Sequence, residues 1–498
     1  IPCASRQNVN KPPKIYFKGL STVKEERRDT GHDIVMMSIN GHLDDDYEPY
    51  NNRVVDHPTT NTETLLHLLK GSLGTGILAM PHAFAQAGYV LGTICTILIG
   101  LLCTYCIHML IDSCYTLCKR KKLPSMTYTA AMETALLEGP ETFRFLAPYS
   151  MHVVNAFLLT YQIGTCCVYV VFVSENIHFV LEKQFHIEIT VFQVMIAILI
   201  PLILINCIRD LKYLAPFTAL ANVLTIISFA IILYYIFREQ PTLVGKDPVG
   251  HYRDFPLFFG TVLFALEAIG VILPLENEMK TPKNFVGKFG VLNQGMITII
   301  ILYVGMGLFG YMRYGAESAG SITLNLPSGT EVLASVVQCL LALAIYITHG
   351  LACFVAINIL WKEYIGIKLF SSKFRIHWEY VLRTVIVLIT FGIAAAVPEL
   401  DLFISLFGAL CLSALGLAFP AIIQSCTYWT IQSRRERITM LSKNAIVVVI
   451  GLFGLVVGTY TSLDGIIKKF SGGGGGHANS TIIEEISNAT ETFSPVSL

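Results

Sequence analysis

Charged residues are scarce in this sequence of 498 residues. Lys, Arg, Asp and Glu make up 14% of it, against about 25% in an average soluble domain. The positive and negative side chains balance at 35 each, and no concentrated basic patch occurs. This composition is not that of a soluble globular domain, and it predicts no nucleic-acid partner.

Motifs of catalysis, nucleotide binding and metal binding are also missing. The 13 cysteines do not occur at metal-ligand spacing. The glycine-rich run from Gly71 to Gly76 lacks the Lys-Ser/Thr ending of a phosphate-binding loop. We therefore expect that the protein is not an enzyme and that it uses no cofactor and no metal ion.

What the sequence has instead is a series of long apolar runs, with 53% hydrophobic residues. Such runs are typical of an all-α polytopic membrane protein embedded in a lipid bilayer. A weakly amphipathic segment at 128–145 is expected on the membrane surface. The eleven predicted spans are about 64–86, 89–113, 148–177, 190–208, 213–237, 256–276, 288–311, 332–360, 379–397, 401–426 and 444–466.

Polar segments flank the predicted transmembrane domain, 64–467. Residues 1–63 are polar and broken by prolines, which predicts a disordered tail. Residues 468–498 include the run Gly472 to Gly476, which predicts a flexible C-terminal tail.

Loop charges predict the orientation. With the N-tail in the cytosol, the predicted inner loops carry 19 Lys and Arg and the outer loops carry 5. Because inner loops are the richer in Lys and Arg, we expect a cytosolic N-terminus and an extracellular or lumenal C-terminus. Asn479 and Asn488 begin two glycosylation acceptor motifs on that face, although either match can arise by chance. The plasma membrane and a lysosomal or endosomal membrane fit equally well.

The run from Gly71 to Gly76 lies in the middle of the first span. Three glycines and two hydroxyl residues in six positions are poor helix formers. A helix break at membrane depth exposes backbone groups, which is tolerable only where they line a cavity or hold a ligand. The sixth span has a similar weak point from Leu266 to Gly270, and a proline follows each, at Pro81 and Pro274.

Two interrupted helices at corresponding positions of inverted halves are typical of a transporter's binding site at the bilayer midplane. The simpler interpretation is that glycine and proline are common in membrane helices. A kink filled by a neighbouring helix would then explain both segments.

Five further features of the chain are the stretches 67–76, 255–261, 273–277, 320–327 and 457–460. These stretches resemble the proton-coupled amino-acid transporters, within the amino acid/auxin permease group and the amino acid–polyamine–organocation superfamily. The resemblance covers about His67 to Tyr460. It implies a five-plus-five inverted repeat of the leucine-transporter type, with discontinuous helices 1 and 6 and one extra helix. It also implies symport of a proton with small neutral amino acids such as glycine, alanine or proline.

An amino acid is a zwitterion, so its site needs donors and acceptors. Amides freed by the first break can hold the carboxylate at the positive end of the following half-helix, and carbonyls freed in span six can hold the ammonium. Gln162 is polar in an apolar span, where substrate contact and helix packing fit equally well. The candidate substrate-binding residues are Gly71, Ser72, Leu73, Gly74, Thr75, Gly76, Gln162, Leu266, Glu267, Ala268, Ile269 and Gly270.

Two titratable residues are candidates for proton coupling. Glu267 lies in mid-span, where inserting a carboxylate into the membrane costs a free energy of at least ~2.5 kcal/mol. A functional role is therefore the default interpretation, and a structural, hydrogen-bonded carboxyl is the alternative. His67 lies one turn before the first break. Its position alone favours an interfacial or packing role, whereas the resemblance implies proton coupling. The family usually has glycine where this chain has Ala268, which leaves the substrate open.

The sequence thus predicts a secondary active transporter that couples a proton to a small neutral amino acid by alternating access. An amino-acid sensor with slow transport, signalling to a cytosolic partner through the N-tail, is the alternative. A passive uniporter is a third possibility, and it could not concentrate substrate under a proton gradient.

Overall fold

The computed structural model describes residues 47–55, 58–209, 211–266, 269–327, 331–369 and 374–472. Within these ranges the chain is helical and forms no strand, only an isolated bridge between Thr59 and Met279. The fold is therefore all-α, as the apolar runs predict. The glycosylation candidates Asn479 and Asn488 lie outside the described residues.

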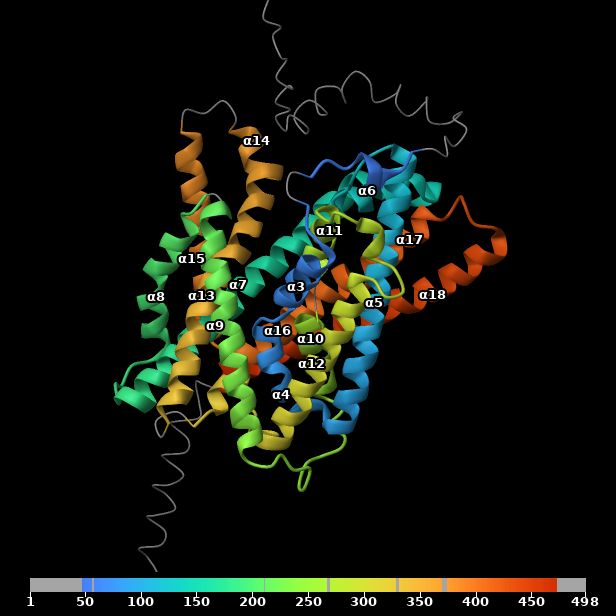
Figure 1. Cartoon of the computed structure of the whole chain (residues 1–498). Helices are drawn as coiled ribbons and strands as arrows, with labels where there is room; N and C mark the ends of the chain where they lie inside the picture. Colours follow the sequence, from blue (N-terminus) through green and yellow to red (C-terminus); the bar gives the residue numbers. More distant parts are fainter. Residues whose placement is uncertain are drawn as a thin grey trace, which may run out of the picture. The chain divides into compact units, whose positions relative to one another are not determined.

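The first part of the chain forms two short helices and a set of long ones (Figure 1). In chain order they are η1 (Pro49–Asn52), α3 (Asn61–Ser72), α4 (Thr75–Ala87), α5 (Tyr89–Lys121), α6 (Tyr128–Glu138), η2 (Glu141–Leu146), α7 (Ala147–Phe185), α8 (Val191–Asn206) and α9 (Leu211–Arg238).

The second part begins at residue 255 and includes three π-helical segments, η6, η7 and η8. In chain order the elements are α10 (Phe255–Leu266), α11 (Ile269–Asn277), η3 (Pro282–Asn284), α12 (Val291–Tyr314), η4 (Gly315–Glu317), η5 (Ile322–Asn325), α13 (Val332–Leu360), η6 (Trp361–Ile365), α14 (Gly366–Lys368), α15 (Arg375–Ala396), α16 (Leu400–Phe407), η7 (Gly408–Ala418), α17 (Phe419–Thr427), α18 (Arg434–Phe453), η8 (Gly454–Gly458) and α19 (Thr459–Gly472).

Eight of the described helical segments are long and apolar enough to cross a membrane, and two shorter apolar helices are α8 and α10. Helical segments occupy all eleven predicted ranges. The chain is thus a polytopic membrane protein, while the count of eleven crossings stays a prediction, because some predicted spans are interrupted or short.

The chain before α3 differs from the prediction of a tail that reaches residue 63. The structure divides the chain between Glu48 and Pro49. The helix α3 begins at Asn61, three residues before the predicted span, because Thr60 and Glu63 form a capping box that satisfies free N–H groups of the first turn.

The interrupted first span lies inside the helical bundle. The helix α4 packs against α10 and α12, and α3 packs against α11 and α12 (Figure 1). Most of α4 is buried, including Ile77 to Met80, as expected for a helix that is apolar on all sides. The long segment Leu400–Thr427 is the most buried of the candidate spans and packs against α10.

Candidate substrate-binding site

The first predicted helix break is present. The helix α3 ends at Ser72, and α4 begins at Thr75 after the N-cap residue Gly74. The amide of Leu73 still donates to the Leu69 carbonyl, at 3.0 Å, whereas the amide of Gly74 turns back to the Ser72 carbonyl, also at 3.0 Å. The glycine-rich run therefore separates two half-helices.

The start of α4 presents hydrogen-bond donors at this break. The first amides of a helix have no partner within it, and here they belong to the turn that begins at Thr75. The side chain of Thr75 is buried, and its Oγ1 has no hydrogen-bond partner among the described residues. Because a buried unpaired hydroxyl costs free energy, this one is available to a polar ligand.

Two tyrosines from other helices lie at the break. Tyr303 of α12 is fully buried, and its hydroxyl donates to the Ser72 carbonyl. Tyr169 of α7 places its hydroxyl oxygen 3.9 Å from where a Cβ on Gly74 would lie. The break is thus enclosed by α7 and α12, and Tyr303 was not among the predicted site residues. A lone tyrosine in an apolar run, such as Tyr303, was the available signal.

The end of α10 meets the start of α4. A Cβ built on Gly76 would lie 2.6 Å from Cα of Ala265, so only glycine allows this approach. Leu266, the last residue of α10, is fully buried. The helix α11 starts at Ile269, and Gly270 is exposed. Glu267 and Ala268 lie outside the described residues.

The remaining predicted residues that the structure describes lie on α3 and α7. His67 and Gly71 are exposed on α3, whereas Ser72 is buried. Gln162 is half-buried on α7, and the ring of its neighbour Tyr161 lies 6.1 Å from that of Phe264 on α10. The structure therefore brings Gly76 next to Ala265, the neighbour of Leu266, and it leaves His67 exposed on its half-helix.

A buried ion pair ties the segment before α3 to α11, and no sequence pattern predicted it. Arg53 donates to both carboxylate oxygens of Glu276, each at 3.0 Å, and to the Glu276 carbonyl at 3.0 Å. Its guanidinium lies 4.7 Å from the ring centroid of Tyr50. Thr59 then pairs with Glu278 and Lys280 through backbone hydrogen bonds of 2.9 Å, so this segment is fixed against the end of α11.

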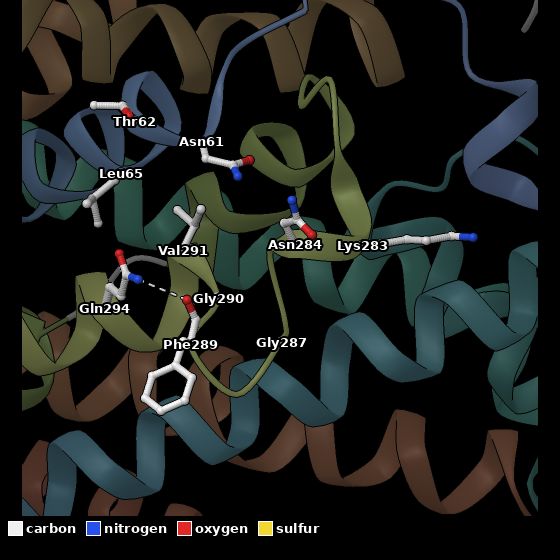
Figure 2. Close-up of a pocket in the computed structure, with 10 residues that line it drawn as sticks. All are labelled: Asn61, Thr62, Leu65, Lys283, Asn284, Gly287, Phe289, Gly290, Val291 and Gln294. Atoms are coloured by element: carbon white, nitrogen blue, oxygen red, sulfur yellow. Dashed lines mark hydrogen bonds between the residues drawn. The ribbon is translucent and has the colours of Figure 1, made fainter.

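A mostly polar pocket of about 330 Å³ lies at the opposite end of α3 from the break (Figure 2). Residues of α3, of η3 and the loop after it, and of the start of α12 line it, including Asn61, Asn284 and Gln294. Gln294 donates to the Phe289 carbonyl at 2.9 Å. The pocket contains none of the predicted substrate-binding residues, so it is not the predicted site.

Comparisons with known proteins extend over most of the chain. Residues 57–463 match the model of a family described as transmembrane amino acid transporter protein. The chain is 40% identical over 427 residues to the proton-coupled amino acid transporter-like protein pathetic of Drosophila melanogaster, covering 86% of this chain and 89% of that protein. It is 28% identical over 434 residues to the probable amino acid transporter skat-1 of Caenorhabditis elegans, covering 83% and 91%.

Proposed function

This chain belongs to the transmembrane amino acid transporter family, whose members are transporters and not enzymes, and we propose that it couples proton entry to the uptake of small neutral amino acids. The relative in Drosophila melanogaster carries the description proton-coupled, which supports the driving ion. Glycine, alanine and proline are the proposed substrates, and alternating access is the proposed mechanism.

One observation carries the proposal: the start of α4 packs against the end of α10 at Gly76 and Ala265. Free amides at the start of one half-helix then lie beside free carbonyls at the end of another. Amides suit the carboxylate of an amino acid, and carbonyls suit its ammonium group. The unpaired Thr75 hydroxyl adds a third polar contact.

The helix packing also supports an inverted repeat. The half-helix α3 contacts α11, and α4 contacts α10, so the half-helices of the two spans pair in opposite order. This is the arrangement expected when interrupted helices of two inverted halves cross at the bilayer midplane. We therefore retain the five-plus-five architecture with one further helix as part of the proposal.

In this proposal His67 and Glu267 couple the proton. The remaining candidate residues of both breaks bind the substrate. The predicted orientation places the N-terminus in the cytosol and the acidic side of the membrane at the far end of α4. A plasma membrane and a lysosomal membrane both supply that gradient.

Uptake into proteoliposomes tests the function. Labelled glycine, alanine and proline are offered with an acidic exterior, with and without sodium, to the wild type, His67→Ala and Glu267→Gln. We expect wild-type uptake to rise as external pH falls and to persist without sodium, and both variants to lose that rise. His377→Ala, which changes an exposed histidine on α15, is the control for His67. Uptake that needs sodium and ignores pH would refute the proposal.

The ion pair between Arg53 and Glu276 favours one second candidate, an amino-acid sensor. The N-tail leads directly into a segment bound to α11, so a movement of α11 on substrate binding would reach the tail and a cytosolic partner. Negligible flux in proteoliposomes, together with amino-acid-dependent binding of a partner to the N-tail, would favour the sensor over the transporter.

A further inference from the structure

A second group of titratable side chains lies at the far end of α4. His82 follows Thr75 by seven residues, about two helical turns. Its Nδ1 lies 2.7 Å from the Ser318 carbonyl oxygen, and its Nε2 lies 3.5 Å from Oδ2 of Asp401 on α16. The amide nitrogen of Gln86 lies 3.1 Å from the same Nε2. His82 thus joins α4 to the loop after η4 and to α16.

These contacts define where a proton would bind. A carbonyl oxygen only accepts hydrogen bonds, so Nδ1 of His82 carries the hydrogen that Ser318 accepts. In the neutral ring Nε2 is then an acceptor, and it receives a hydrogen bond from the Gln86 amide. This lone pair also faces the Asp401 carboxylate. A proton added to Nε2 would convert that contact into a charge-assisted hydrogen bond.

The Gln86 side chain can follow such a change. Its Oε1 is buried and has no hydrogen-bond partner among the described residues. A half-turn of the amide would present this oxygen to a protonated Nε2 in place of the amide nitrogen. The surroundings of His82 can therefore satisfy both the neutral ring and the charged ring.

Further carboxylates lie near Asp401. Glu175 of α7 interacts electrostatically with Asp401, with Glu399 and with Lys469 of α19, and Lys469 is paired with Glu399. Oε2 of Glu175 is shielded from solvent and has no hydrogen-bond partner within the described ranges. Lys469 also interacts with Asp401, so the carboxylate that contacts His82 shares this ammonium group with two other acidic residues.

A proton suits this group better than a metal ion. In the part of the chain that the structure describes, no three His, Cys, Asp or Glu side chains come together to hold a metal. His178, one turn beyond Glu175, lies 3.3 Å from the Glu182 carboxylate, so it is engaged elsewhere. Histidine is the side chain that normally changes charge between pH 5 and 8.

We propose that His82 and Asp401 form a proton-binding site that loads from the external or lumenal side. The proton binds at Nε2 of His82 and strengthens the contact with Asp401, which draws α4 toward α16. Its release toward the cytosol weakens that contact and frees α4. This inference rests on the proposed proton-coupled function, and it adds a site at the opposite end of the interrupted span from His67.

Proteoliposomes with a pH-sensitive dye inside test this site. Labelled alanine is offered under an inward gradient of one pH unit, which supports up to about tenfold accumulation for one proton per substrate. We expect His82→Gln to exchange alanine in counterflow but to accumulate it no more than about onefold and to admit no protons with it. His108→Gln, which replaces a half-buried histidine bound to Asn293, should accumulate alanine as the wild type does.

The outcomes separate this site from the function itself. If the wild type admits no protons with glycine, alanine or proline, the proposed function fails. If the wild type does so and His82→Gln accumulates alanine equally well, the proposed site is wrong while the function stands.

If His82→Gln loses counterflow altogether, a second measurement on the wild type still tests the site. Diethyl pyrocarbonate modifies neutral imidazole, and mass spectrometry quantifies the reaction at His82 as pH falls. We expect the reaction to decline between pH 8 and 5, with a lower midpoint in Asp401→Asn. A midpoint that this substitution does not move would overturn the site.

Discussion

Substitution of Gly76 by alanine should separate α4 from α10. Carbon atoms pack best at about 3.5–4.0 Å, whereas the new Cβ would lie 2.6 Å from Cα and 3.1 Å from Cβ of Ala265. The nearest atom belongs to backbone and cannot rotate away, so the helices must move apart by about 1 Å. Overpacking of this kind costs about 1–3 kcal/mol, offset by about 1 kcal/mol from the better helix propensity of alanine.

Thermal unfolding in detergent and uptake of labelled alanine measure the two consequences. Gly305→Ala on α12 is the matched control, because a Cβ there meets nothing within 4 Å. We expect the control to unfold at or above the wild-type temperature and to transport normally, and Gly76→Ala to unfold earlier and to transport much more slowly. If Gly76→Ala matches the control in both assays, the contact between α4 and α10 does not build the site.

Three further variants follow from single contacts. Thr75→Val removes a hydroxyl that has no protein partner among the described residues. The half-saturation concentration for alanine should therefore rise, while the unfolding temperature stays equal or increases. A marked loss of stability would contradict this. Arg53→Ala leaves the Glu276 carboxylate buried and unpaired, which should destabilise the protein by about 3–5 kcal/mol, and a loss below about 1 kcal/mol would show that the pair is solvated. Glu331→Gln tests pH dependence. The hydrogen bond from Arg238 lowers the pKa of Glu331. The stabilisation by the Glu331 carboxylate is therefore fully present above its ordinary pKa of about 4.3 and is lost only as the pH falls below that value. The difference in unfolding temperature from wild type should therefore be equal at pH 7.5 and 5.5.

The first break was predictable because its cause is local. Glycines and hydroxyl residues between Gly71 and Gly76 disfavour a helix wherever they stand, and the flanking apolar residues fix the depth. The start of α3 at Asn61 was not predicted, although Thr60 and Glu63 have the spacing of a capping box. Apolar runs located the long helices, although α5 ends at Lys121 instead of 113, α7 ends at Phe185 instead of 177, and α18 begins at Arg434 instead of 444.

The partners of the break were not predictable, because they depend on which helices become neighbours. Tyr303 is a single polar residue in an apolar run, and nothing near it in sequence indicates that α12 lies at the break. Arg53 lies in a polar segment that composition assigns to a tail, yet one buried carboxylate fixes it. His82 follows Pro81 within α4, and its importance depends on Asp401, more than 300 residues away.

The two ends of the interrupted span are each held by charged side chains from another helix. Near the start of α3, Arg53 binds Glu276 of α11, and near the end of α4, His82 contacts Asp401 of α16. A transporter that opens to alternate sides must weaken one end while the other holds. Histidine is the side chain that normally changes charge between pH 5 and 8, so the proposed proton site would act on the contact of His82. A proton from outside would therefore strengthen only the outer contact, and this asymmetry is what proton-driven alternation requires.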